Sequence, residues 1–202
     1  HLIHEFGGIE NRLKNAGIKN VTLHKLTGSP FSLRFYKVDI AQVENVKITF
    51  EEPNLTIPSP IDNPVKYYYC SYIDTKNLSI ESNYDSNYGI FVYWSYGADF
   101  KNITIGDVVT NAMNFKHVVS GSVKGLTSTF RSYNTGNKAI SVGYGSQRIK
   151  LEDINVKNGH IQLQSSPEFQ YSNDIHLDNV HIDQGFIHLR NLKNSTIKNV
   201  TM

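Results

Sequence analysis

The sequence has almost no cysteine, no marked excess of either charge and no long apolar run. Cys70 is its only cysteine, so no internal disulfide can form and packing and hydrogen bonds must stabilise the fold. We predict that this thiol is buried or half-buried. The net charge is +2 over 202 residues, and no run of Lys or Arg could follow a phosphate backbone. These features argue against nucleic acid as a partner.

Membrane segments are also missing from the sequence. No stretch approaches the 18 apolar residues of a spanning helix, and no signal-peptide pattern opens the chain. We therefore expect no membrane partner. At 39% hydrophobic content the chain can still bury a core, and its length fits one domain.

The sequence does contain a six-residue pattern that occurs eight times, reading apolar, charged, Asn, apolar, polar, apolar. The copies, with small departures, are IKNVTL from Ile18, VENVKI from Val43, TKNLSI from Thr75, FKNITI from Phe100, VKGLTS from Val123, LEDINV from Leu151, LDNVHI from Leu177 and IKNVTM from Ile197. The third positions are Asn20, Asn45, Asn77, Asn102, Gly125, Asp153, Asn179 and Asn199. Asn, Asp and Gly enter the left-handed backbone region at the lowest cost, so each copy predicts a sharp bend between two short strands.

Successive third positions lie 25, 32, 25, 23, 28, 26 and 20 residues apart. A supersecondary unit repeated at this period predicts a solenoid. Residues before and after each bend alternate between apolar and polar, and a third alternating stretch follows a variable loop, as in Ile140-Ser-Val142 and Ile187-His-Leu189. Alternation also places Ile90, Val92 and Trp94 inside, with Phe91 and Tyr93 outside.

These features resemble the right-handed parallel β-helix of the pectate-lyase-like superfamily, in which an Asn ladder stacks at one corner from coil to coil. The resemblance implies an all-β, single-stranded right-handed parallel β-helix of about eight rungs, with three strands per rung. It is specific for the fold and says little about function, because this fold hosts lyases, hydrolases, epimerases, adhesins and phage tailspikes.

Residues 18–202 are expected to form the β-helix domain. Residues 1–17 are either an amphipathic N-terminal cap or a partial preceding rung. Because β-helix ends expose unpaired strand edges and no cap is visible after Met202, we expect a segment of a longer chain or ends covered by partner chains.

In the resembled family, ligands lie along the outward face of the strand that follows the variable loop. The predicted register places carbohydrate-binding candidates on that face, with Tyr36, Gln164 and Arg190 beside them. The candidates are Arg34, Tyr68, Tyr93, Ser141, Gln162 and His188. Aromatic faces stack on sugar rings, while amides and Arg bind hydroxyl and anionic groups. The alternative for this row is an ordinary solvated sheet face.

Catalytic candidates are weaker. The row lacks a carboxylate, whereas glycoside hydrolysis normally needs two acids flanking the scissile bond. Glu81 and Asp85 flank the aromatic stretch and are the best pair for a hydrolase. His176, His181 and His188 fall on three different strands and cannot converge, so no metal site and no cofactor are expected.

For function, we expect a bacteriophage tailspike or tail-appendage segment that recognises a host cell-surface polysaccharide. It would act from the virion, and trimerisation or flanking domains would cover its edges; a secreted protein is the alternative location. A slightly basic chain would suit an anionic glycopolymer. The alternatives are a polysaccharide-degrading enzyme on the same scaffold and a structural rod or adhesin stalk.

Overall fold

The computed structural model describes residues 12–26, 33–51, 64–165 and 171–202, and every regular element in them is a strand. The twelve strands of these residues form one sheet. They are β1 (Leu13–Leu26), β2 (Leu33–Tyr36), β3 (Val38–Glu51), β4 (Val65–Tyr68), β5 (Ser71–Thr129), β6 (Lys138–Gly143), β7 (Gln147–Lys157), β8 (His160–Gln164), β9 (Ser172–Asp183), β10 (Ile187–Arg190), β11 (Leu192–Lys193) and β12 (Thr196–Thr201).

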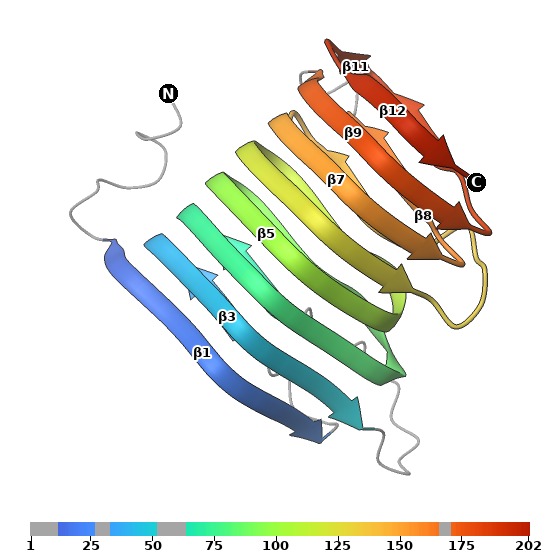
Figure 1. The fold of residues 1–202 in the computed structure, drawn as a ribbon. Helices are drawn as coiled ribbons and strands as arrows, with labels where there is room; N and C mark the ends of the chain where they lie inside the picture. The colour runs from blue at the N-terminus through green and yellow to red at the C-terminus, as the bar shows by residue number, and fades with distance from the viewer. Residues whose placement is uncertain (1–11, 27–32, 52–63, 166–170) are drawn as a thin grey trace.

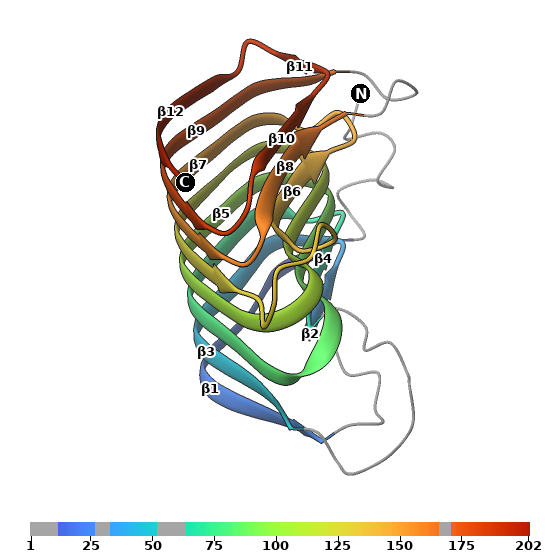
Figure 2. The same cartoon turned by 90° about the vertical axis from the view of Figure 1, so that its right-hand side faces the viewer.

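The strands coil into a parallel β-solenoid. One side of the coil carries β1, β3, β5, β7, β9 and β12 in sequence order, stacked as inclined parallel ribbons (Figure 1). The view at right angles shows the chain returning on the opposite side through β2, β4, β6, β8 and β10 (Figure 2). The long strand β5 contains three copies of the repeat, bending at Asn77, Asn102 and Gly125. The pairings between strands in the described residues are parallel, for example Val43 opposite Thr75 and Leu151 opposite Leu177.

The third position of every repeat has a positive φ, between 49° and 73°. The side-chain amides of neighbouring copies are joined by hydrogen bonds. Asn45 Nδ2 donates to Asn20 Oδ1 at 2.9 Å, Asn77 Nδ2 to Asn45 Oδ1 at 2.8 Å, and Asn102 Nδ2 to Asn77 Oδ1 at 3.0 Å. This confirms the predicted ladder at one corner. Gly125 interrupts it because glycine has no side-chain amide.

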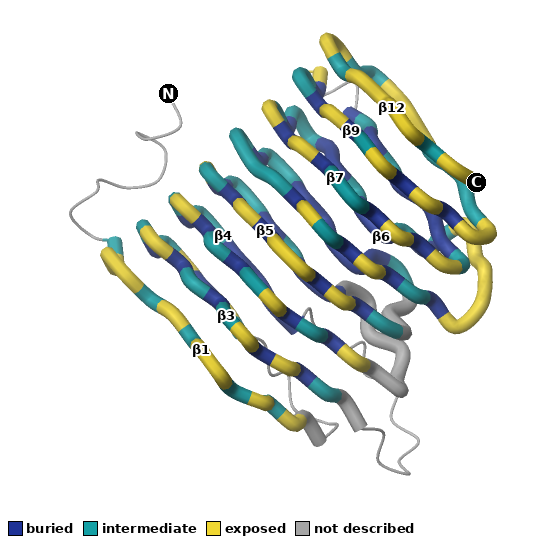
Figure 3. Tube along the Cα trace, in the orientation of Figure 1, coloured by how far each residue is buried: buried dark blue, intermediate teal, exposed yellow. Residues whose placement is uncertain are grey.

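The core lies inside the coil and is built from the apolar positions of the repeat. Leu78, Ile103, Leu126 and Ile154 occupy the fourth position and are almost completely buried. Along β7 and β9, buried positions largely alternate with more exposed ones (Figure 3), because side chains of a strand point alternately inward and outward. Cys70 is buried among these residues, as expected.

Three sequence expectations need correction or completion. The solenoid makes about six turns instead of about eight. Residues 13–17 belong to β1 and pair with β3, while residues 1–11 of the expected cap lie outside the described residues. Trp94 is half-buried with φ 47°, because the chain turns a corner there instead of continuing the strand alternation.

Candidate functional site

The outward side of the returning strands carries all six predicted carbohydrate-binding residues. We call it the lateral face: the outer side of β2, β4, β6, β8 and β10 and of residues 90–93 and 111–116 of β5. Arg34 and His188 are exposed on it, and Tyr68, Tyr93, Ser141 and Gln162 are half-buried.

The six residues do not form a single file. Tyr68 stands between Tyr36 and Tyr93, whereas Arg34 lies opposite Lys66, which is opposite Phe91. The alternation of apolar and polar residues could not separate these two rows, because residues two apart in a strand share a face. Only the pairing between strands decides which of them are neighbours.

Toward the C-terminus, three of the six predicted residues do lie side by side. Ser141, Gln162 and His188 pair with one another across β6, β8 and β10. Gln164 and Arg190 pair two residues further along the same strands.

Aromatic rings gather at the end of the lateral face nearest the following corner. We call them the aromatic band: Tyr36, Tyr68, Tyr69, Phe91, Tyr93, Trp94, His117 and Tyr144. Tyr93 is its centre, since its ring centroid lies 5.8 Å from Tyr68, 5.9 Å from Trp94 and 5.7 Å from His117. The His117 ring stacks on Trp94 at 3.9 Å with an interplanar angle of 10°. The band therefore continues over five successive coils, from Tyr36 to Tyr144.

Half of the band occupies an unusual backbone conformation. Tyr69, Trp94, His117 and Tyr144 have φ values of 55°, 47°, 55° and 57°. A residue with a side chain pays roughly 1–2 kcal/mol in this left-handed region, so bulky residues seldom adopt it. Sequence reasoning missed this corner because it looked for bends at Asn, Asp and Gly. The sequence signal that could have revealed this corner is an aromatic residue directly after the third strand in successive coils.

Buried hydroxyl groups fix the same corner. Ser95 Oγ donates to the Tyr93 carbonyl oxygen at 3.0 Å and accepts the backbone N–H of Cys70 at 3.2 Å. Two coils further on, Ser146 Oγ donates to the Gly143 carbonyl oxygen at 2.7 Å and accepts the N–H of Val118. The repeated arrangement holds the corner backbone rigid beneath the rings.

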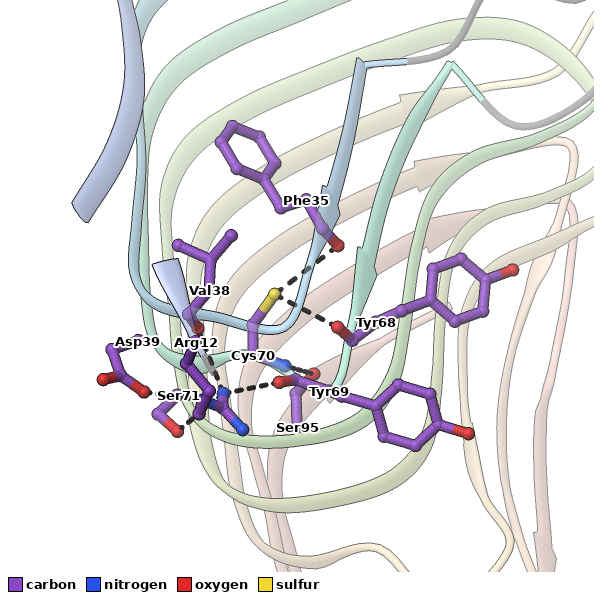
Figure 4. A network of polar contacts seen from close by, with 9 residues as sticks. All are labelled: Arg12, Phe35, Val38, Asp39, Tyr68, Tyr69, Cys70, Ser71 and Ser95. Atoms are coloured by element: carbon purple, nitrogen blue, oxygen red, sulfur yellow. Dashed lines mark hydrogen bonds and ion pairs between the residues drawn. The ribbon is translucent and has the colours of Figure 1, made fainter. Parts of the chain in front are cut away.

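Cys70 supports this corner without being reactive. Its Sγ lies 3.5 Å from the carbonyl oxygens of Phe35 and Tyr68, toward which the thiol donates (Figure 4). Burial raises the pKa of the Cys70 thiol to about 11, so it stays protonated at neutral pH and is a poor nucleophile.

Glu81, one of the two predicted catalytic acids, does not lie on the lateral face. Glu81 lies after the bend of its repeat, opposite Thr49 of β3. Its exposed carboxylate pairs with Lys47 at 2.7 Å, and the hydrogen bond from Lys47 is the main cause that lowers the pKa of Glu81. A general acid needs a raised pKa instead. The side chain of Asp85 lies outside the described residues.

No group of three or more His, Cys, Asp or Glu side chains able to hold a metal comes together in the described ranges. His176 instead lies 2.8 Å from the Thr196 hydroxyl. Within the described ranges, no helix is long and apolar enough to cross a membrane.

Charge is distributed unevenly between the two sides of the coil. The lateral strands carry Arg34, Lys66, Lys116, Lys138 and Arg190, and their sequences contain no Asp or Glu between 33–36, 65–68, 90–93, 111–116, 138–143, 160–164 and 187–190. On the repeat strands, by contrast, lysines are paired with acids, as in Lys19–Glu44 at 2.9 Å and Lys150–Glu152 at 2.6 Å. Arg34 and Arg190 are exposed, Lys116 and Lys138 are half-buried and Lys66 is buried, so four of these cations bring positive charge to the lateral face beside the aromatic rings.

Together these features define a class: a parallel β-solenoid, consistent with a parallel β-helix, that has an aromatic and cationic lateral face. No protein-family model and no curated protein sequence matches the chain.

Proposed function

We propose that the chain binds a cell-surface polysaccharide along its lateral face, as a segment of a bacteriophage tailspike or related tail appendage. The observation that carries the proposal is the aromatic band, in which half-exposed rings from successive coils are held at a corner of strained backbone. Such rings offer apolar faces to the C–H groups of sugar rings, and neighbouring Gln162, Ser141 and Arg190 offer hydrogen bonds to hydroxyl groups.

The exposed rings, more than the strain itself, support a binding role over a purely structural rod, because Tyr72 and Arg148 adopt the same φ outside the band. Asn or Gly would turn the corner at lower cost, as Asn191 does at the equivalent place after β10. Strained residues concentrate at ligand-binding sites, where the surrounding structure compensates for their cost. A degrading enzyme on the same scaffold has less support, because Glu81 is exposed, ion-paired and has a lowered pKa.

The test is the substitution Tyr93→Ala. It removes the central ring of the band, and we expect the affinity for the bound polysaccharide to fall about tenfold or more, as for a ring at the centre of an interface. The screen would use immobilised O-chains, capsules and wall polymers from bacteria, followed by calorimetry on the polysaccharide that binds.

Tyr171→Ala is the matched control, because Tyr171 is 49% exposed and its ring lies under the Lys193 ammonium, outside the band. Unchanged affinity in Tyr93→Ala, with wild-type circular dichroism, would refute the lateral face as the binding site. New reducing ends or unsaturated products during incubation would favour the enzyme instead.

A further inference from the structure

Lys116 differs from five lysines of the repeat strands in its partners. Lys19, Lys47, Lys76, Lys124 and Lys150 each have a carboxylate within 4.0 Å. Lys116 has no ion pair among the residues that the structure describes. Its Nζ lies instead 4.6 Å from the centroid of the Tyr144 ring and 5.6 Å from that of Phe91.

The position of Lys116 places this charge inside the aromatic band. Lys116 immediately precedes His117, whose ring stacks on Trp94 and contacts Tyr93. Across the next coil Lys116 pairs with Gly143, where a side chain cannot be added because its Cβ would lie 2.5 Å from the Gln164 carbonyl oxygen. The half-buried ammonium is therefore bordered by rings on two sides and by a bare backbone position on a third.

This arrangement combines two kinds of recognition. A cation above ring faces is held by the ring quadrupole and keeps N–H donors for a ligand. A hydrogen bond from an ammonium to an anionic oxygen is about twice as strong as a neutral one. Since the lateral strands contain no acid, no fixed negative charge on them competes for the ammonium.

We propose that Lys116 is the specificity-determining residue of the lateral face and that it selects a sugar polymer carrying an anionic group, carboxylate or phosphate, next to a ring-stacked sugar. This inference rests on the proposed polysaccharide function. It adds the sign of the charge on the ligand and the residue that recognises that charge. A single strand of nucleic acid shares the phosphate and ring chemistry. It fits less well, because the cations of this face do not form a continuous track.

The test compares polymers that share one backbone: plain dextran, carboxymethyl-dextran and dextran phosphate, with an oligothymidylate as the nucleic-acid probe. The wild-type protein should bind at least one anionic dextran about tenfold more tightly than plain dextran, which corresponds to about 1.4 kcal/mol. The better of the two derivatives identifies the anionic group. In Lys116→Met, which keeps the apolar stem, the ratio of the affinities for the anionic and the plain dextran should fall to about one.

Lys101→Met is the control, since it removes the same charge from an exposed position on the repeat side. An equal loss of the preference for anionic dextran in both variants would show that net charge alone matters, and it would overturn the inference. Wild-type protein that binds anionic and plain dextran equally well would also overturn it. So would wild-type protein that binds the oligothymidylate more tightly than the dextrans. Tyr93→Ala separates the two proposals: if it abolishes polysaccharide binding while Lys116→Met leaves the preference intact, the proposed function stands and the inference falls.

Discussion

At the scale of single residues, the same left-handed conformation serves two different purposes at two corners of the coil. At the repeat corner it is occupied by residues that adopt it cheaply, and their amides join neighbouring coils, as Asn179 Nδ2 does by donating to Asp153 Oδ1 at 2.7 Å. At the band corner it is occupied by Tyr69, Trp94 and His117, which adopt it at a cost. The first corner stabilises the fold and the second presents rings to solvent.

His160 should make the stability of the protein depend on pH. Its ring is buried and stacked on Phe186 at 4.4 Å, and burial lowers its pKa to about 4, with a smaller contribution from Lys138. In the unfolded chain His160 takes up its proton near pH 6.5. The unfolded state therefore binds more protons between these values, and the free energy of unfolding should fall by on the order of 3 kcal/mol as pH drops from about 6.5 to 4.

The substitution His160→Phe preserves the stacking and removes the titrating group. Urea unfolding at several pH values should show a weaker loss of stability on acidification in this variant than in the wild type. His176→Phe, which changes an exposed histidine, should leave the wild-type slope intact. Identical slopes for the wild type and His160→Phe would contradict the assignment.

At the scale of elements, adjacent coils are tied together by side chains as well as by backbone ladders. Arg12 is the clearest case at the N-terminal end of the described chain. Its Nε donates to Asp39 Oδ1 at 2.6 Å, and its NH2 group donates to the carbonyl oxygens of Val38 and Tyr69 and to the Ser71 hydroxyl (Figure 4). The side chain is only 6% exposed, so one guanidinium links β1 to the following two coils.

Replacing Arg12 by Met should loosen the first coil. The substitution leaves buried carbonyl oxygens without a donor and Asp39 without its cation, which typically costs about 2–3 kcal/mol. We expect faster hydrogen exchange of β1 amides, with β7 and β9 amides unchanged, because each coil contacts only its neighbours. Lys14→Met, at an exposed neighbouring position, should not alter exchange, and uniform acceleration over all strands would contradict a local role.

At the scale of the whole molecule, stability depends on stacking inside the coil. Four buried rings from successive coils form an internal stack. Phe35 lies 5.1 Å from Tyr67, Tyr67 lies 5.9 Å from Phe100, and Phe100 lies 5.6 Å from Phe115. Burial also raises the pKa of the Tyr67 phenol, whose oxygen lies 2.7 Å from the Thr75 hydroxyl. This stack connects the coils beneath the aromatic band.

Phe100→Ala should therefore disrupt more than one coil. Removing a completely buried ring typically costs 3–5 kcal/mol, because the surrounding coils cannot close the cavity. We expect a lower midpoint of urea unfolding and a less cooperative transition, since the coupling between neighbouring coils carries the cooperativity of a solenoid. Phe100→Leu, which fills most of the space, should lose much less. If the leucine variant lost as much stability as the alanine variant, the contacts between rings would explain the loss and the size of the cavity would not.

The solenoid could be predicted because its cause is local and repeated. A left-handed residue such as Asn77 followed by alternating apolar residues dictates a bend and a strand wherever it occurs, so the period of the pattern reveals the coil. The outward position of Tyr68 and Tyr93 followed from the same alternation. The number of turns was less certain, because the sequence does not mark whether a terminal copy completes its coil.

The sequence by itself thus determined the coil, the Asn corner and which side chains point outward, since each depends on residues close together in the chain. Only the tertiary structure decided which outward residues become neighbours: that Tyr93 meets Tyr68, Trp94 and His117, that Lys116 lies over Tyr144, and that Glu81 faces away from all of them. The contacts of Tyr93 with Tyr68 and His117, and that of Lys116 with Tyr144, join residues about 25 positions apart. They are set by the pairing of whole coils, and loops of unequal length between the strands hide this pairing from the sequence.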